Sequence, residues 1–247
     1  MTKINDLIKN LTIGADSQDL ALKFIPWFSQ LVNETLQVKD QFHIAIPGGS
    51  TPGILFRTLA GAAGNTLDWD KIHWWWTDER VVEPTNEASN FAAINKDLLQ
   101  VRAIPTQNIH RVKGEITPKV AGQLYGIEME EVLARNSSSI PYFDLVVLGM
   151  GTDGHVASLF PDKTHEEPHP WVSTVKHEGL YRVSLSYEVI LASLQIAYLV
   201  TGSNKAQVVQ DIVTLSEKGK KLPGGIIWEK RPNAHWFLDS AATKLIA

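Results

Sequence analysis

Two short, almost wholly apolar runs, LVVL at 145–148 and AYLV at 197–200, constrain the fold of this chain more than any other feature. A strand with one face in water alternates apolar and polar residues, whereas an unbroken apolar run is typical of a strand buried on both faces. Segments with apolar residues at helical spacing separate these runs from one another. We therefore predict an α/β fold, a three-layer α/β/α sandwich around a mostly parallel, Rossmann-like sheet.

Other segments of the chain predict where individual helices and strands begin and end. Residues 16–37 are expected to form a helix that begins at Asp16 or Ser17, and residues 89–100 a helix capped by Ser89. The run KIHWWWTDERVV, 71–82, is predicted to be one aromatic-rich strand, with the tryptophans serving core packing more than a sugar platform. PDKTHEEPHP, 161–170, is predicted to be a connection. No segment resembles a domain linker, so residues 1–247 are expected to form one domain.

Composition excludes several classes of function. The formal net charge of −4 predicts no nucleic-acid partner, so an anionic small substrate would need a local positive pocket. There are no cysteines, which excludes thiolate nucleophiles and zinc–cysteine sites and fits a reducing compartment. The first residues lack the apolar core of a signal peptide, and no stretch is long enough to span a membrane. We expect a cytoplasmic protein; the sequence does not determine its oligomeric state.

A glycine-rich segment, DLVVLGMGTDGHVASLFP at 144–161, follows the first of the apolar runs. Its G-x-G-x-x-G spacing is that of a dinucleotide fingerprint, but Pro161 interrupts the helix that such a site needs, and no acidic residue follows at a strand end. The alternative is a loop whose glycines admit another ligand and whose His155 performs acid–base chemistry. Asp153 could then hold one ring nitrogen. A purely structural His155 would cap the next helix or bond a backbone carbonyl.

Three further segments place polar residues at predicted strand ends. The segment PGGSTP predicts an anion site at a helix N-terminus, formed by Gly48, Gly49, Ser50 and Thr51. A serine that only caps the helix is the alternative explanation of this segment. TDER offers Asp78 and Arg80, either to a ligand or as a structural ion pair. GSNKA offers Lys205 to a phosphate, although a lysine there is often only solvated. Arg182 is a further candidate anion contact. The histidines at 165, 169 and 177 lack a metal-ligand pattern, and no metal is predicted.

Taken together, these segments resemble the 6-phosphogluconolactonase family, in the family's order and over nearly the whole chain. The matching pieces are PGGSTP, TDERVV with SNFAAINKDLL, DLVVLGMGTDGHVASLFP, RVSLS, VTGSNKA and WFLDSAA. The resemblance implies hydrolysis of a sugar-phosphate lactone, a fold like that of glucosamine-6-phosphate deaminase, and no cofactor. It implies His155 as general base, with Asp153, Arg80 and Asp78 as its catalytic partners. It also implies substrate or phosphate binding by Gly48, Gly49, Ser50, Thr51, Gly151, Arg182 and Lys205.

Three rival hypotheses remain beside this one. An amino-sugar phosphate deaminase on the same fold would resemble DGHIAFNEP at the loop, and here Phe160 stands where its relay glutamate would be. Ser158 as a nucleophile lacks the G-x-S-x-G setting of a serine hydrolase. A sugar-phosphate sensor would not need His155, and the chain has no basic arm. We therefore expect hydrolysis by water that His155 activates.

Overall fold

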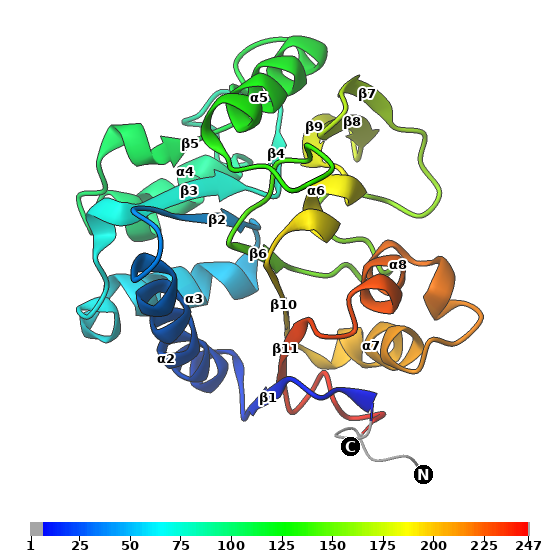
Figure 1. The fold of residues 1–247 in the computed structure, drawn as a ribbon. Coiled ribbons are helices and arrows are strands. Elements are labelled where there is room, and N and C mark those ends of the chain that lie inside the picture. The colour runs from blue at the N-terminus through cyan, green and yellow to red at the C-terminus, as the bar shows by residue number, and fades with distance from the viewer. Residues whose placement is uncertain (1–6, 247) are drawn as a thin grey trace.

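The computed structural model describes residues 7–246 and contains one large parallel sheet (Figure 1). Its strand order is β1-β11-β10-β6-β2-β3-β5, and each neighbouring pair is parallel. The two runs that suggested the fold lie side by side as β6 and β10 near its centre. The bounds are β1 Leu11–Gly14, β2 Phe42–Ile46, β3 Ile72–Trp76, β5 Ile109–His110, β6 Leu145–Leu148, β10 Gln195–Val200 and β11 His235–Asp239.

Helices cover both faces of this sheet, as Figure 1 shows. One face carries α2, α3 and α4, and their apolar residues form one core with the sheet. The other face carries α5, α6, α7 and α8, which form a second core. The predicted α/β/α sandwich is therefore confirmed. The bounds are α2 Ser17–Leu36, α3 Ser50–Ala60, α4 Asn90–Ile94, α5 Pro118–Val132, α6 Tyr187–Ala192, α7 Ala206–Val213 and α8 Pro223–Lys230. None of the described helices combines the length and the apolar character that crossing a membrane requires.

The helix starts predicted at Asp16 or Ser17 and at Ser89 are confirmed. The carboxylate of Asp16 accepts hydrogen bonds from the backbone N–H groups of Gln18 and Asp19, so it caps α2. The hydroxyl of Ser89 accepts from the N–H of Ala92 at the start of α4. The predicted helix over 89–100 changes character partway, because a π-helical turn at Asn95–Leu99 follows α4. Such turns are single and occur inside α-helices, so they produce no repeating pattern of apolar residues from which they could be predicted.

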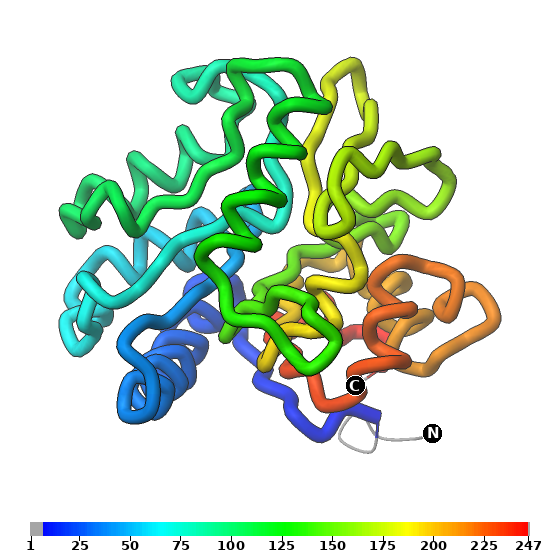
Figure 2. Tube along the Cα trace, turned by 45° about the horizontal axis from the view of Figure 1, so that its top comes forward, coloured from blue at the N-terminus to red at the C-terminus, as the bar shows by residue number. Residues whose placement is uncertain are grey.

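A second, four-stranded antiparallel sheet was not predicted. Its order is β4-β9-β8-β7, with β4 Asp78–Arg80, β7 Glu166–His169, β8 Val172–His177 and β9 Leu180–Leu185. Figure 2 shows α5, in green, beside the yellow-green β8 and β9, and the contacts between these elements agree. Two predictions were therefore wrong: residues 161–170 contain β7, and residues 71–82 contain two strands. The aromatic strand ends at Trp76, and Thr77 joins the sheets by bonding Ile46 on one side and Leu185 on the other.

The three consecutive tryptophans of β3 are core residues, as predicted. Trp74, Trp75 and Trp76 are each fully buried. Trp74 and Trp76 belong to the core under α2 and α3, whereas Trp75 belongs to the core on the opposite face. This division follows from the alternation of side chains along a strand. A sugar platform would need an exposed ring, so these side chains serve packing alone.

A buried histidine cluster lies on the same sheet, away from the strand ends considered below. His43, His73 and His110 come from β2, β3 and β5, and the rings of His43 and His73 are 4.6 Å apart. Glu128 of α5 contacts His110 Nδ1 at 2.7 Å, and His110 Nε2 lies 2.9 Å from His73 Nδ1. If His110 Nδ1 donates to the carboxylate and its Nε2 accepts, the Nδ1–H of His73 is the donor between the two rings. Trp75 Nε1 donates to His43 Nδ1, which requires a lone pair there.

This cluster makes folding stability sensitive to acid. Burial, with the neighbouring His73, lowers the pKa of His43 from 6.5 to about 3, and burial with His110 lowers that of His73 to about 4. The unfolded chain binds these protons more readily than the folded protein does. The contribution of the two histidines to folding stability is therefore fully present above the pKa near 6.5 that they have in the unfolded chain, and it falls as the pH drops toward their pKa values in the folded protein. We expect the free energy of unfolding to fall by about 4 kcal/mol from pH 7 to about pH 5, with each of the two histidines contributing about half. Urea unfolding at both pH values measures this loss.

The matched variant is His73→Gln, which keeps a polar side chain but cannot take up a proton in this range. It should show a smaller loss of unfolding free energy between the two pH values than the wild type. Equal losses in both proteins would mean that other groups cause the acid sensitivity.

Candidate active site

Polar residues from four separate strand ends meet at the carboxyl edge of the parallel sheet. They line two adjoining hollows of about 240 Å³ and about 150 Å³, which share Gly48, Gly49, Gly149, Met150 and Lys205. Every site residue predicted from the sequence lines one or both hollows, except Asp153, which contacts one of the lining residues. The carboxyl edge is where ligands bind in open α/β sheets, because the loops that follow the strands converge there.

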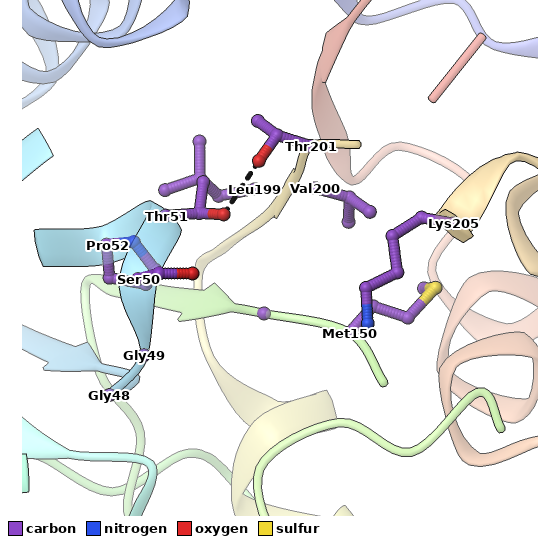
Figure 3. A pocket seen from close by; sticks show the side chains of 11 residues that line it. Gly48, Gly49, Ser50, Thr51, Pro52, Met150, Leu199, Val200, Thr201 and Lys205 are labelled. Carbon is purple, nitrogen blue, oxygen red and sulfur yellow. Dashed lines mark hydrogen bonds between the residues drawn. The ribbon is translucent and has the colours of Figure 1, made fainter. Parts of the chain in front are cut away.

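The smaller hollow is built around the start of α3. Gly49 occupies the N-cap position with φ of +111°, a conformation that residues with a Cβ rarely adopt, and no side chain caps the helix. The alternative of a Ser cap is therefore wrong, because Ser50 is already the first helical residue. Figure 3 shows Ser50 and Thr51 on one side of the hollow and Lys205 opposite. Uncapped N–H groups facing a lysine suit an anion.

Thr51 and Lys205 are each held by the surrounding structure. Thr51 Oγ1 lies 2.7 Å from Thr201 Oγ1, which ties the start of α3 to the end of β10. Sequence reasoning did not single out Thr201, although it directly follows a predicted strand. Burial lowers the pKa of Lys205, while the nearby Asp153 carboxylate acts in the opposite direction. No carboxylate among residues 7–246 forms an ion pair with this partly buried ammonium. It therefore favours an anionic ligand, because such a ligand restores the stabilisation lost on leaving water.

His155 and Asp153 form a contact within the glycine-rich loop. His155 Nδ1 lies 2.6 Å from Asp153 Oδ1, and His155 lines the larger hollow. Partial burial raises the pKa of Asp153, but the charge and N–H groups of His155 outweigh it and leave this pKa below its usual value. The ionised carboxylate can only accept, so Nδ1 carries a proton, and in the neutral form of the ring the lone pair lies on Nε2. The imidazole is thereby prepared to take a proton at Nε2.

Gly151 makes room for this pair. A Cβ at Gly151 would lie 2.1 Å from His155 Nδ1 and 2.4 Å from Asp153 Oδ1, so only glycine permits the contact. The Gly151 N–H also donates to the carbonyl of His155 at 2.9 Å and closes the loop. The residue was predicted to contact substrate; its geometry gives it the further role of seating the histidine and the aspartate.

The rest of this segment does not resemble a dinucleotide site. Its third glycine, Gly154, is followed by a turn, and the next helix is α6 at Tyr187–Ala192, beyond the small sheet. A pyrophosphate site needs a helix N-terminus directly after the loop. The same observation removes the alternative that His155 caps the next helix. In the described residues, 7–246, no three His, Asp or Glu side chains converge as metal ligands would.

Arg80 and Arg182 lie directly opposite each other on β4 and β9, and both line the larger hollow. Like charges in such a pair are destabilising. The Nε atom of each is buried, and within the described part of the chain neither Nε has a hydrogen-bond partner. Burial, with the adjacent Arg80, lowers the pKa of Arg182. Two donors held without partners beside a hollow indicate an anionic ligand, because a buried donor left unpaired costs free energy.

Asp78 and Ser158 form a buried pair beside these arginines. Ser158 Oγ donates to Asp78 Oδ2 at 2.6 Å, and Ser158 is fully buried. Asp78 lines the hollow, whereas Ser158 does not. A serine whose hydroxyl proton is bound to a carboxylate and which lies outside the hollow cannot reach a ligand there. The structure therefore disfavours Ser158 as a nucleophile and gives it the task of orienting Asp78.

Glu79 and Asn90 are two functional neighbours that sequence reasoning missed. Side chains alternate along β4, so Glu79 points away from the hollow and accepts from the N–H groups of Asn90 and Phe91, both at 2.7 Å. Burial raises the pKa of Glu79 to about 7 despite these bonds. Asn90 is thereby fixed in the wall of the larger hollow, where its Nδ2 donates to the carbonyl of Asp78 at 2.8 Å. The spacing of TDER and SNF alone did not indicate this link.

The fold and this site define an α/β protein with a hollow lined by cationic side chains and a carboxylate-bound histidine at a strand end. Residues 15–236 match the family model of glucosamine-6-phosphate isomerases/6-phosphogluconolactonase. The 6-phosphogluconolactonase of Haemophilus influenzae is 36% identical over 213 residues, which are 85% of this chain and 90% of that protein. The chain therefore belongs to this family, and the prediction of an enzyme related to the 6-phosphogluconolactonases is confirmed.

Solved structures agree with this placement. The crystal structure of a devB protein has a TM-score of 0.85 and 33% sequence identity, covering 96% of this chain and 99% of that one. A monomeric glucosamine-6-phosphate deaminase has a TM-score of 0.77 over 96% of this chain and 99% of that one, at 15% identity. The second likeness shows the fold alone, and it confirms the deaminase-like architecture predicted from the sequence.

Proposed function

We propose that this protein hydrolyses 6-phospho-D-glucono-1,5-lactone to 6-phosphogluconate, the second step of the oxidative pentose phosphate pathway, in the cytoplasm and without a cofactor. The observation that carries the proposal is the contact of 2.6 Å between His155 and Asp153 at the edge of a hollow that two arginines also line. The relative from Haemophilus influenzae, named a 6-phosphogluconolactonase, supports the same substrate class.

The proposed reaction uses His155 as the general base. Its Nε2 takes a proton from a water molecule whose oxygen attacks C1 of the lactone. The carbonyl oxygen becomes negatively charged, and the guanidinium groups of Arg80 and Arg182 stabilise it. The C1–O bond of the ring then breaks, and the imidazolium returns the proton to the ring oxygen. One water has been added across one ester bond, and the product is a carboxylic acid with a free hydroxyl. The acid then ionises and releases one proton to solvent, which leaves the carboxylate.

The two adjoining hollows suggest how the substrate lies. The phosphate would occupy the smaller hollow, between the start of α3 and Lys205, and C1 would lie in the larger one near His155. Lys205 lines both hollows, so a single ligand can span them. The alternative of a deaminase finds no support in the loop, because Phe160 is a buried aromatic residue that cannot relay protons. A sensor would bind the ligand but not turn it over.

The test is turnover of 6-phosphogluconolactone by the purified protein, measured as acid released above the spontaneous rate. We expect acceleration of the lactone reaction and no release of ammonia from glucosamine 6-phosphate. Ammonia release without lactonase activity would favour the deaminase, and tight binding of 6-phosphogluconate without turnover would favour the sensor.

A further inference from the structure

The side chain of Phe160 contacts two imidazole rings. Its ring centroid is 4.5 Å from that of His155, at an interplanar angle of 48°. It is also 3.9 Å from the ring of His177, to which it is nearly parallel at 20°. Phe160 is only 5% exposed, so its ring is held inside the protein. His177 comes from a different element from the other two, namely the end of β8.

The β8–β9 hairpin holds Phe160 from two positions. His177 is the last residue of β8, and the turn through Glu178 and Gly179, both with positive φ, leads back into β9. Arg182 on β9 places its guanidinium 5.5 Å from the centre of the Phe160 ring. The hairpin therefore contacts Phe160 through both His177 and Arg182, and Phe160 in turn contacts His155. This contact chain joins the antiparallel sheet to the loop that carries the proposed general base.

The hydrogen bond to Asp153 does not by itself fix the orientation of the His155 ring. Asp153 lies two residues away in the same turn, and its side chain is 45% exposed. One hydrogen bond at Nδ1 fixes that atom but permits the ring to turn about the direction of the bond. A ring packed against the imidazole restricts this rotation and so fixes the direction of Nε2. A proton transfer depends steeply on this direction, because a displacement of about 1 Å can reduce a rate about a hundredfold.

We infer that His177 is a positioning residue for His155, that it acts through Phe160, and that its flat ring is the property required. The inference rests on the function proposed above. The surroundings of His177 favour the neutral ring: burial lowers its pKa first, followed by the charge of Arg182, while Glu178 at 3.8 Å partly offsets this. Stacking on Phe160 is therefore its main interaction, rather than a salt bridge.

The kinetic test compares three substitutions at His177 with a control on the same hairpin. His177→Ala and His177→Leu remove the flat ring, and His177→Phe keeps it without a titratable nitrogen. The control is Tyr181→Ala, since Tyr181 is 44% exposed and its ring faces Lys176 rather than Phe160. For the Ala and Leu variants we expect kcat about tenfold lower with KM within about twofold, because position and not binding is lost. His177→Phe and Tyr181→Ala should retain the wild-type kcat.

A second readout does not depend on catalysis. The ring protons of His155 can be followed by NMR in all of these proteins, and their chemical shifts report the stacking on Phe160. We expect the His155 signals to move in the Ala and Leu variants and to return in His177→Phe. A wild type without lactonase activity would overturn the proposed function, yet these shifts would still test the positioning.

Two results would overturn the inference. Unchanged His155 signals together with an unchanged kcat in both the Ala and the Leu variants would show that the stack does not position the ring. A Phe variant as slow as the Ala variant would show that an imidazole nitrogen, and not the flat ring, is what the site uses.

Discussion

Replacing His155 with alanine is expected to lower kcat for lactone hydrolysis about a thousandfold, since a positioned acid–base group contributes about 10²- to 10⁴-fold. Nδ1 of His155 is held 2.6 Å from Asp153, so the lost function is proton transfer at Nε2. The side chain is not part of either hydrophobic core, and the fold should therefore persist. The measurement is the rate of acid release above the spontaneous rate, with the affinity for 6-phosphogluconate measured separately by calorimetry.

The matched control is His165→Ala, a nearby histidine that lines neither hollow. It should hydrolyse the lactone at the wild-type rate. Asp153→Asn should be intermediate, because an amide oxygen still accepts from Nδ1–H but carries no charge to stabilise the imidazolium. If His155→Ala turned over the lactone as fast as the wild type, the general base would have to be a different residue.

Arg182→Met should separate ligand affinity from stability. Arg182 lies opposite Arg80 in the β4–β9 register, and its Nε is buried without a partner in the part of the chain that the structure describes. A hydrogen bond to a charged group is worth about 1.5–3 kcal/mol, so affinity for 6-phosphogluconate should fall about tenfold to hundredfold. The melting temperature should be unchanged or higher, because the substitution removes the repulsion between two like charges.

Arg231→Met is the contrasting control. Arg231 donates to the backbone carbonyls of Leu191, Ser193 and Leu194, the last two at 2.7 Å and 3.0 Å, and it lines neither hollow. We expect a lower melting temperature with unchanged affinity, the reverse of the result for Arg182. A loss of stability in Arg182→Met without any loss of affinity would show that this arginine is structural.

Much of the candidate site could be predicted because its residues follow strands that the sequence reveals. Strands buried on both faces appear as unbroken apolar runs, and all the strands of a parallel sheet point their carboxyl ends toward one edge. Polar residues directly after such runs therefore meet at that edge. This reasoning located Gly49, Asp78, His155 and Lys205, which the structure brings together around the two hollows.

The antiparallel sheet could not be predicted by the same reasoning. β7 reads EEPH and is largely exposed, so it has neither an apolar run nor an alternation. β4 continues directly from the aromatic run, and only Thr77 marks the change of sheet. Strands of this kind exist because partners far away in the chain offer hydrogen bonds, and such pairing leaves no local pattern.

The sequence by itself determined the class of fold, the edge of the sheet at which the candidate site lies and the loop that carries the histidine, because buried strands and the direction of the chain produce local patterns. Only the tertiary structure decided which side chains touch. It turned Glu79 away from the hollow to hold Asn90, placed Arg182 against Arg80, and stacked His177 on Phe160. These contacts depend on the register between strands and on the packing of distant segments, which no single stretch of sequence specifies.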